Sequence, residues 1–152
     1  MKGMYLNNKL IYIYTDGACR GNPGPGGWGA LLRCENYKKE IKGSSQLTTN
    51  NIMELTAVIE SLKLIKNTSK IIITTDSKYV KNGINDWIHS WKLKGWKTAN
   101  KKPVKNKELW QELDSLTNKH QIDWKWVRGH TGHAGNERAD KLANDAIDEL
   151  VL

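Results

Sequence analysis

Two short apolar strands, each followed by an aspartate, constrain the fold of this chain most strongly. The first predicted strand covers Lys9 to Ala18, with the apolar run Leu10 to Tyr14 just ahead of Asp16. The second covers Ile71 to Thr75, carries no charge and ends directly before Asp76, as is typical of strands buried in parallel sheets. Ligands of open α/β sheets bind at the C-terminal ends of such strands. The pattern therefore predicts an α/β domain with two acids at its binding edge.

The remaining periodicity completes a mixed-sheet α/β domain. The other predicted elements are a turn over Gly21–Gly27, strands over Trp28–Arg33 and between Tyr37 and Leu47, a helix after the cap candidates Thr49 and Asn50, a helix from Ser77 to Ile84, another around Trp87, an amphipathic helix over Asn106–Lys119, a half-exposed strand over Gln121–Val127 and a helix over Asn136–Val151. No repeat or linker divides them. Residues 1–152 therefore fit a single domain, with residues 1–8 as an N-terminal extension.

The charge distribution favours a polyanionic partner. Lysine and arginine number 24 against 16 acids, which gives a net charge of +8. The stretch 87–105 contains no acid but six lysines and three tryptophans, namely Lys92, Lys94, Lys97, Lys101, Lys102, Lys105, Trp87, Trp91 and Trp96. Lysines neutralise phosphates and indoles stack on bases, so this segment predicts nucleic-acid binding. The alternative is a solvated helix whose tryptophans lie in the core.

Several other classes are disfavoured by composition. No apolar run approaches the roughly 20 residues of a membrane span, and no stretch has the form of a secretory signal. The two cysteines, Cys19 and Cys34, are too few for a disulfide scaffold and are interpreted as reduced thiols. The glycine-rich GNPGPGG segment lacks the Gly-Lys-Ser/Thr ending of a phosphate loop. We expect a cytoplasmic monomer that has no membrane segment and no obligate protein partner.

The acids at the strand ends predict a cation site. If the two strands are neighbours, Asp16 and Asp76 lie side by side and repel each other unless a proton or a cation separates them. Oxygen ligands without thiolate favour Mg²⁺ or Mn²⁺ over zinc. Glu54, one turn into its helix, and Asp140, in the last helix, can join the pair. Each of these two also fits a structural role, as helix-dipole compensation or as an ion-pair partner.

A histidine follows the last predicted strand. His130 lies in VRGHTGHAGNE, a segment with three glycines. A histidine in such a loop can move a proton near neutral pH. The spacing His130-x-x-His133 also permits a metal site, but no other nitrogen or sulfur ligand lies nearby.

Four blocks of the chain resemble those of bacterial type 1 ribonucleases H. The blocks are YTDGACRGNPGPGGWGALL, TTNNIMELTAVIESL, TTDSKYVKNGI and WVRGHTGHAGNERADKLA, in family order from about Lys9 to Ala146. The resemblance implies a ribonuclease H-like fold, a five-stranded mixed sheet of three antiparallel strands followed by two parallel ones, flanked by helices. It also implies an endoribonuclease that hydrolyses the RNA strand of RNA–DNA hybrids without strong sequence specificity. The reaction would use two Mg²⁺ ions, with Mn²⁺ as a substitute, and leave 5′-phosphate and 3′-hydroxyl ends.

The resemblance also implies roles for individual residues. The metal-binding catalytic carboxylates would be Asp16, Glu54, Asp76 and Asp140, and His130 would assist proton movement and product release. The substrate contacts would be Cys19, Asn22, Asn50 and Asn51, a DNA-phosphate pocket of Arg33 and Thr49, the groove-lining Trp87 and Trp91, and a protrusion over 87–105 that includes Lys92, Lys94, Lys97, Lys101 and Lys102. Lys78 stands where relatives often carry glutamine, which puts one minor-groove hydrogen bond in doubt.

Two alternatives from other classes stay open at this point. One is a catalytically silent hybrid- or duplex-binding module, which requires a broken carboxylate set, whereas all four acids are present. The other is a different metal nuclease on the same scaffold, such as a junction resolvase or a strand-transfer enzyme. Such enzymes share scattered acids but lack the TDG, TNN and RGHTGH blocks.

Overall fold

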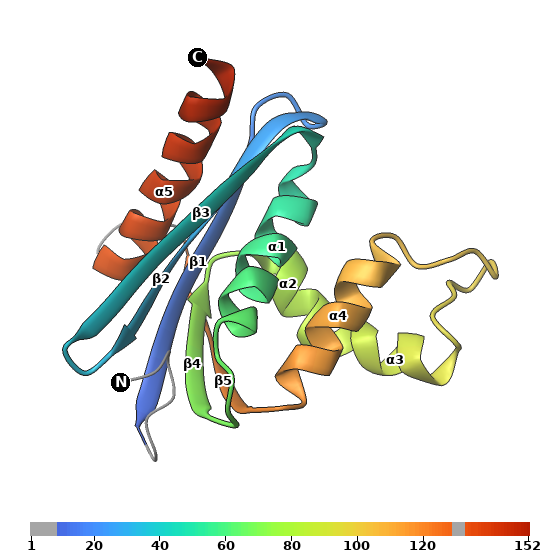
Figure 1. Cartoon of the computed structure of the whole chain (residues 1–152). Coiled ribbons are helices and arrows are strands. Elements are labelled where there is room, and N and C mark those ends of the chain that lie inside the picture. The colour runs from blue at the N-terminus through green and yellow to red at the C-terminus, as the bar shows by residue number, and fades with distance from the viewer. Residues whose placement is uncertain (1–8, 129–132) are drawn as a thin grey trace.

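The predicted strands form one five-stranded sheet in the order β3-β2-β1-β4-β5 (Figure 1). The computed structural model describes residues 9–128 and 133–152. Its strands are β1 (Leu10–Cys19), β2 (Gly24–Cys34), β3 (Tyr37–Thr48), β4 (Lys70–Thr75) and β5 (Gln121–Trp126). The first three are antiparallel, and β4 and β5 run parallel to β1. This confirms the expected mixed sheet, while the predicted extension 1–8 lies outside the described residues.

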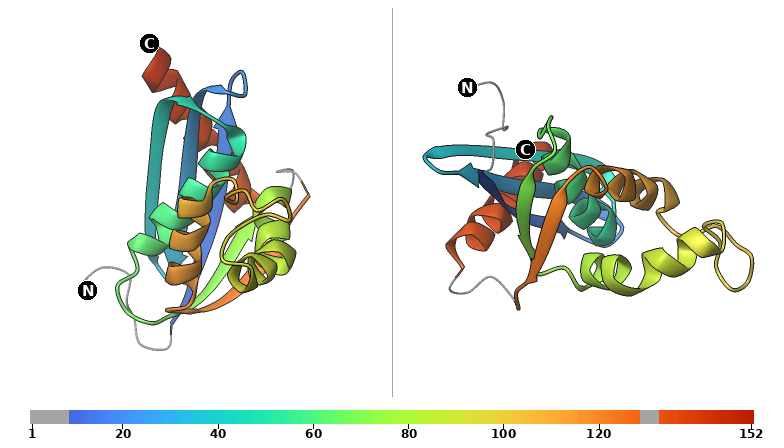
Figure 2. Two further views of the ribbon diagram at one scale, coloured as in Figure 1. Left: turned by 90° about the vertical axis from the view of Figure 1, so that its right-hand side faces the viewer. Right: turned by 90° about the horizontal axis from the view of Figure 1, so that it is seen from below.

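Helices cover both faces of the sheet. They are α1 (Asn50–Lys63), α2 (Lys78–Asn82), the π-helical turn η1 (Gly83–Trp87), α3 (Ile88–Leu93), α4 (Lys107–Thr117) and α5 (Ala134–Val151). On one face α1 packs against β1 and β2 with α4 beside it, and α5 lies across the other face (Figures 1 and 2). Across the described parts of the chain, no helix combines the length and the apolar character that a bilayer crossing requires.

The core lies between the sheet and the α1–α4 face. Its fully buried side chains include Ile11 and Ile13 of β1, Ile71 and Ile73 of β4, Leu55, Ile59 and Leu62 of α1, and Trp110 and Leu113 of α4. Alternation along the strands places one set of side chains on this face. The helix start at Thr49 is confirmed, because its hydroxyl accepts a hydrogen bond from the Ile52 N–H at 3.2 Å. The apolar patterns of both central strands therefore predicted the core correctly.

The glycine-rich segment before Trp28 is partly strand, whereas the sequence predicts only a turn there. β2 begins at Gly24, and Gly26 and Gly27 pair with β3. A Cβ at Gly27 would lie 2.4 Å from the carbonyl oxygen of Ala143, and one at Gly29 would lie 2.5 Å from the Leu142 side chain. The glycines therefore let α5 lie directly on the sheet, a requirement that turn propensity does not reveal.

The segment after β4 is nearly continuous helix, whereas the sequence predicts two separate helices. Ser77 caps α2 as expected, accepting the Val80 N–H at 3.1 Å. The π-helical turn η1 then joins α2 to α3. It begins at Gly83, where a Cβ would lie 2.0 Å from the ring of the fully buried Trp110. Because Gly83 has no side chain, the Trp110 ring can pack directly against the helix backbone at this position.

We expect the substitution Gly83→Ala to lower the free energy of unfolding by about 1–3 kcal/mol, because the new methyl group overpacks this contact. Urea denaturation followed by circular dichroism measures the change. The control is Asn85→Ala in the same turn, where the side chain is exposed and the change should stay within about 0.5 kcal/mol. Equal denaturation midpoints for Gly83→Ala and wild type would contradict this account of the turn.

Candidate active site

The two strand-end aspartates lie where parallel pairing stops. Pairing of β1 with β4 ends at Tyr14 and Thr74, while β1 continues beside β2 to Cys19. Asp16 therefore lies within β1 but beyond its last β4 partner, and Asp76 directly follows β4. Both acids stand at the C-terminal edge of the parallel strands, as expected.

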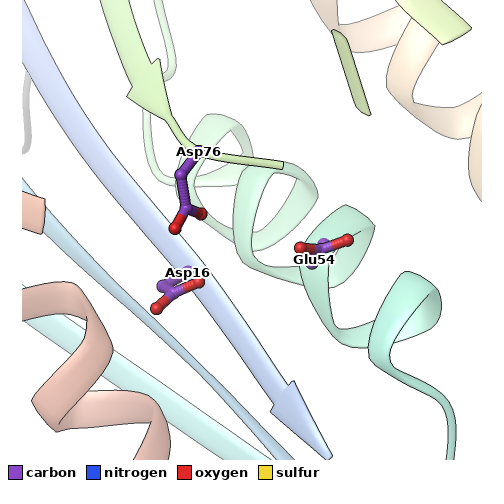
Figure 3. A group of neighbouring side chains, drawn as sticks. All are labelled: Asp16, Glu54 and Asp76. Atoms are coloured by element: carbon purple, nitrogen blue, oxygen red, sulfur yellow. The ribbon is translucent and has the colours of Figure 1, made fainter. Parts of the chain in front are cut away.

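Three carboxylates converge at this edge. One oxygen each from Asp16, Glu54 and Asp76 lies within 4.8 Å of the other two. Figure 3 shows the Asp76 carboxylate directed toward Asp16, with Glu54 beside them on α1. Gly17 permits this approach, because a Cβ there would lie 2.5 Å from the Glu54 backbone nitrogen. A glycine directly after Asp16 thus lets the helix that carries Glu54 lie against β1.

The fourth predicted acid reaches the cluster from the opposite face of the sheet. Asp140 of α5 forms a hydrogen bond with the carboxyl group of Asp16. Its Oδ1 also accepts from the side-chain amide of Asn144 at 3.3 Å. The start of α5 is held in place by Arg138, whose guanidinium makes two hydrogen bonds to Glu40 of β3 at 2.5 and 2.8 Å. All four predicted carboxylates therefore gather at one place.

Burial and mutual repulsion hold protons on this cluster when no cation is bound. Burial, followed by the charge of Asp76 and the contact with Asp140, raises the pKa of Asp16 to about 9. Burial also raises the pKa of Glu54 to about 7, opposed by hydrogen bonds from Ser77 and Asn50. A group of oxygen ligands that resists ionisation on its own has the chemistry of a metal site, because a cation can replace the protons.

The metal-free protein should therefore lose stability as the pH rises. Unfolding returns Asp16 and Glu54 to ordinary values of 3.8 and 4.5, so the folded state binds more protons between about pH 4 and pH 9. In EDTA, we expect Asp16→Asn to raise the free energy of unfolding by about 1–3 kcal/mol at pH 8. The gain should vanish below pH 3.8, where the Asp16 carboxyl is protonated in the folded and in the unfolded state alike. Denaturation curves across this pH range test the expectation, and a gain that does not depend on pH would contradict it.

Four of the predicted substrate-contact residues gather near the start of α1, the helix that carries Glu54: Cys19, Asn22, Asn50 and Asn51. The Asn22 side-chain oxygen accepts from the Asn50 N–H at 3.0 Å, and the Cys19 thiol donates to the Thr48 carbonyl at 3.4 Å. Asn50 and Asn51 form the first turn of α1. The turn after β1 and the start of α1 therefore make one polar surface next to the carboxylates.

Arg33 and Thr49 do not share a pocket, and this prediction is wrong. Thr48, the residue before Thr49, pairs with Gly24 at one end of β2, whereas Arg33 pairs with Lys38 at the other end. The nine residue steps along β2 from Gly24 to Arg33 span roughly 30 Å. The antiparallel β2–β3 hairpin carries the two residues apart, and neither motif reveals that separation. Thr49 alone stays beside the site.

Trp87 and Trp91 of the basic segment pack toward the core, and Trp87 is also exposed at the surface. Trp87 and Trp91 have ring centroids 5.8 Å apart, and Trp91 lies 5.5 Å from the buried Trp110. Trp87 is nevertheless 37% exposed. The segment that begins with α3 extends beyond α4, away from the sheet (Figures 1 and 2). The five lysines predicted to contact substrate are exposed along it: Lys92, Lys94, Lys97, Lys101 and Lys102.

The sequence did not reveal two polar residues that hold the carboxylates. The sequence predicts Ser77 only as a helix cap, yet its side chain also lowers the pKa of Glu54 by favouring the ionised carboxylate. Asn144 contacts Asp140 from four residues along α5, a spacing that could have indicated the contact. Lys78 is the exposed first residue of α2, directly after Asp76 and Ser77. His130 lies outside the described residues.

Comparison with known proteins agrees with this geometry. The family model described as RNase H matches residues 8–148. Ribonuclease HI of Neisseria meningitidis serogroup B is 62% identical over 137 residues, which cover 90% of this chain and 94% of that protein. Ribonuclease H of Francisella tularensis subsp. novicida is 62% identical over 148 residues, 97% of each chain.

Solved structures agree in fold. LC9-RNase H1, a type 1 RNase H with the type 2 active-site motif, superposes with a TM-score of 0.84 at 35% identity, over 95% of this chain and 75% of its own. LC11-RNase H1 in complex with an RNA/DNA hybrid gives a TM-score of 0.67 at 26% identity, over 93% and 99%. The match along almost the whole chain, the shared fold and the gathered acids lead to one conclusion: this chain belongs to the ribonuclease H family.

Proposed function

We propose that this protein is an endoribonuclease that hydrolyses the RNA strand of RNA–DNA hybrids and leaves 5′-phosphate and 3′-hydroxyl ends. The observation that carries the proposal is the convergence of Asp16, Glu54 and Asp76 within 4.8 Å, in a chain of the ribonuclease H family. One solved relative, LC11-RNase H1, is in complex with such a hybrid. The net charge of +8 suits a nucleic-acid substrate.

The four acids are proposed to hold two Mg²⁺ ions, with Mn²⁺ as a substitute. The donor set of Asp16, Glu54, Asp76 and Asp140 offers only oxygen, which hard divalent cations prefer. When bound, the ions supply Lewis-acid chemistry that activates the attacking water and stabilises the charge on the departing 3′-oxygen. Within the protein, Ser77 and Asn50 favour the ionised form of Glu54, because their side chains lower its pKa, and the Asn144 amide donates a hydrogen bond to Asp140.

Selection of a hybrid requires contacts to both strands. We propose that Cys19, Asn22, Asn50 and Asn51, which lie near the carboxylates, contact the minor groove, where the 2′-hydroxyl identifies RNA. Trp87 and Trp91 are proposed to border the DNA strand, and the basic segment 87–105 to bind its backbone. Minor-groove contacts of this kind discriminate poorly between bases, so little sequence specificity is expected. The proposed enzyme acts as a monomer.

A panel of substrates tests the proposed function. The protein is incubated with an RNA–DNA hybrid, double-stranded RNA and branched DNA, each in Mg²⁺ and in EDTA. We expect cleavage of the RNA strand of the hybrid in Mg²⁺ alone. Binding without cleavage would identify a silent binding module. Cleavage of branched DNA in preference to the hybrid would identify another metal nuclease on this fold.

His130 is proposed to shuttle a proton during turnover. We expect His130→Ala to lower the turnover rate by about 10²-fold while leaving measurable cleavage, because general acid–base groups contribute on this scale. Multiple-turnover assays on the hybrid measure the change, and the control is His120→Gln, directly before β5 and so at the opposite end of that strand from the carboxylates. Equal rates for His130→Ala and wild type would remove this role.

A further inference from the structure

A basic cleft opens directly beside the carboxylate cluster. It is lined by Asp76 at one end and by Lys78, Lys81, Trp126 and Arg128 along its walls. Lys78 and Lys81 are three residues apart on α2, so their side chains lie on one face of that helix. Arg128 faces the same cleft from the chain that leaves β5. Three cations thus surround a hollow that begins at a proposed metal ligand.

The walls of this cleft are fixed by the sheet. The Val127 N–H donates to the Thr75 carbonyl at 3.1 Å, which extends the pairing of β4 and β5 past Trp126. This bond holds Arg128 near the chain that carries Asp76. The Trp126 ring stacks on Trp124 with centroids 5.3 Å apart and planes 6° from parallel. The cleft therefore has an aromatic wall, Trp126, beside its three exposed cations.

Within the described residues, 9–128 and 133–152, the three cations of the cleft have no other partner: the side chains of Lys78, Lys81 and Arg128 make neither an ion pair nor a hydrogen bond there. By contrast, Lys63, Lys92 and Arg138 are all paired with acids of neighbouring elements. The cleft thus sets three cations against one acid, Asp76, and this excess of positive charge favours a bound anion.

We propose that Lys78, Lys81 and Arg128 form a subsite for one RNA-strand phosphate adjacent to the phosphate that is cut. The inference rests on the proposed function, since it places the scissile phosphate at the carboxylate cluster. If the scissile phosphate lies at the carboxylate cluster, the RNA strand continues from there in both directions. One of these directions leads into the cleft, because Asp76 also lines the cleft. A backbone phosphodiester in the cleft gains charge-assisted hydrogen bonds from lysine and arginine. The contacts would hold the strand in register without reading its sequence.

Hybrid binding by the double variant Lys81→Gln/Arg128→Gln gives the first test. Fluorescence anisotropy in EDTA, over a series of KCl concentrations, measures affinity without cleavage. We expect binding to weaken about tenfold and the plot of log affinity against log salt to become shallower by about 1. The matched control is Lys66→Gln/Lys119→Gln, two exposed lysines before β4 and β5, at the opposite end of these strands. Thermal melting verifies that both variants fold.

Neutral phosphates in the substrate separate a direct contact from a general effect of charge. Single methylphosphonate linkages are placed at each position within two nucleotides of one cleavage site, on the RNA strand and then on the DNA strand. For wild type, one RNA linkage should lower kcat/KM about tenfold. For the double variant, introducing the same linkage should lower kcat/KM by less than a further twofold, because the contact to that phosphate is already lost. The subsite would be overturned if, at every RNA linkage, the effect of the double variant and the effect of the methylphosphonate on kcat/KM simply multiplied. It would also be overturned if the variant cancelled the effect of a DNA linkage and of no RNA linkage.

The wild-type protein on unmodified hybrid keeps the two proposals separate. Failure of wild type to cut that hybrid in Mg²⁺ would overturn the proposed function. The subsite alone would be overturned if wild type cuts the hybrid normally and the double variant binds it as tightly as wild type does.

Discussion

Replacing Asp16 by asparagine should abolish cleavage of the RNA strand and leave hybrid binding intact. Asp16 lies at the centre of the cluster, near Glu54 and Asp76 and hydrogen-bonded to Asp140. The amide removes a negative ligand from the cation site while keeping the shape of the side chain. We expect kcat to fall by about 10³-fold or more, equivalent to about 4 kcal/mol of transition-state stabilisation.

Binding should survive this change for an electrostatic reason. Asp16 is only 6% exposed, and in the metal-free protein it stays protonated, because burial raises its pKa to about 9. In EDTA the asparagine therefore replaces a neutral side chain of nearly the same shape. The affinity for hybrid in EDTA should therefore stay equal to that of wild type. The control is Asp123→Asn, an exposed acid of β5, which should cut normally. Cleavage by Asp16→Asn at the wild-type rate in Mg²⁺ would show that the site is assigned wrongly.

Removing the lysines of the basic segment should weaken binding of the hybrid strongly and leave the rate of cleavage of bound hybrid nearly unchanged. The change is glutamine at all five predicted substrate lysines, namely Lys92, Lys94, Lys97, Lys101 and Lys102. If each neutralises one phosphate, the slope of log affinity against log salt becomes shallower by about 4, and affinity near 0.1 M salt falls about 10²-fold or more. These side chains are exposed, so stability should change little.

Two readouts make this experiment decisive. At saturating hybrid, kcat should stay near the wild-type value, because the segment extends away from the sheet whose edge carries the carboxylates (Figure 1). Lys92 forms an ion pair with Asp114 at 3.3 Å, so restoring Lys92 alone should recover less affinity than restoring the unpaired Lys94. An unchanged salt slope for the fivefold variant would show that the segment does not meet the substrate.

The sequence predicts the framework of this protein well because local signals decide it. Uncharged, β-branched runs define β1 and β4, and hydroxyl caps at Thr49 and Ser77 begin α1 and α2. The acids that follow the two runs meet because parallel strands end at a common edge. Each of these features depends on a few neighbouring residues.

The remaining features depend on contacts between distant segments. The glycines of β2 look like a turn until α5 is seen lying on Gly27 and Gly29. The π-helical turn at Gly83 follows from the Trp110 ring, which lies on another helix. Arg33 lies far from Thr49 because the register of the β2–β3 hairpin separates them, and a sequence motif does not contain that register. The cleft beside Asp76 combines α2 with the end of β5 and has no sequence signal.

The central claim is that four dispersed acids hold divalent cations, and anomalous diffraction from crystals soaked in Mn²⁺ tests it most directly. We predict manganese peaks within coordination distance of the carboxylate oxygens of Asp16, Glu54 and Asp76, with Asp140 contributing beside Asp16. Peaks confined to other parts of the molecule, or carboxylates that point to separate faces, would contradict the account.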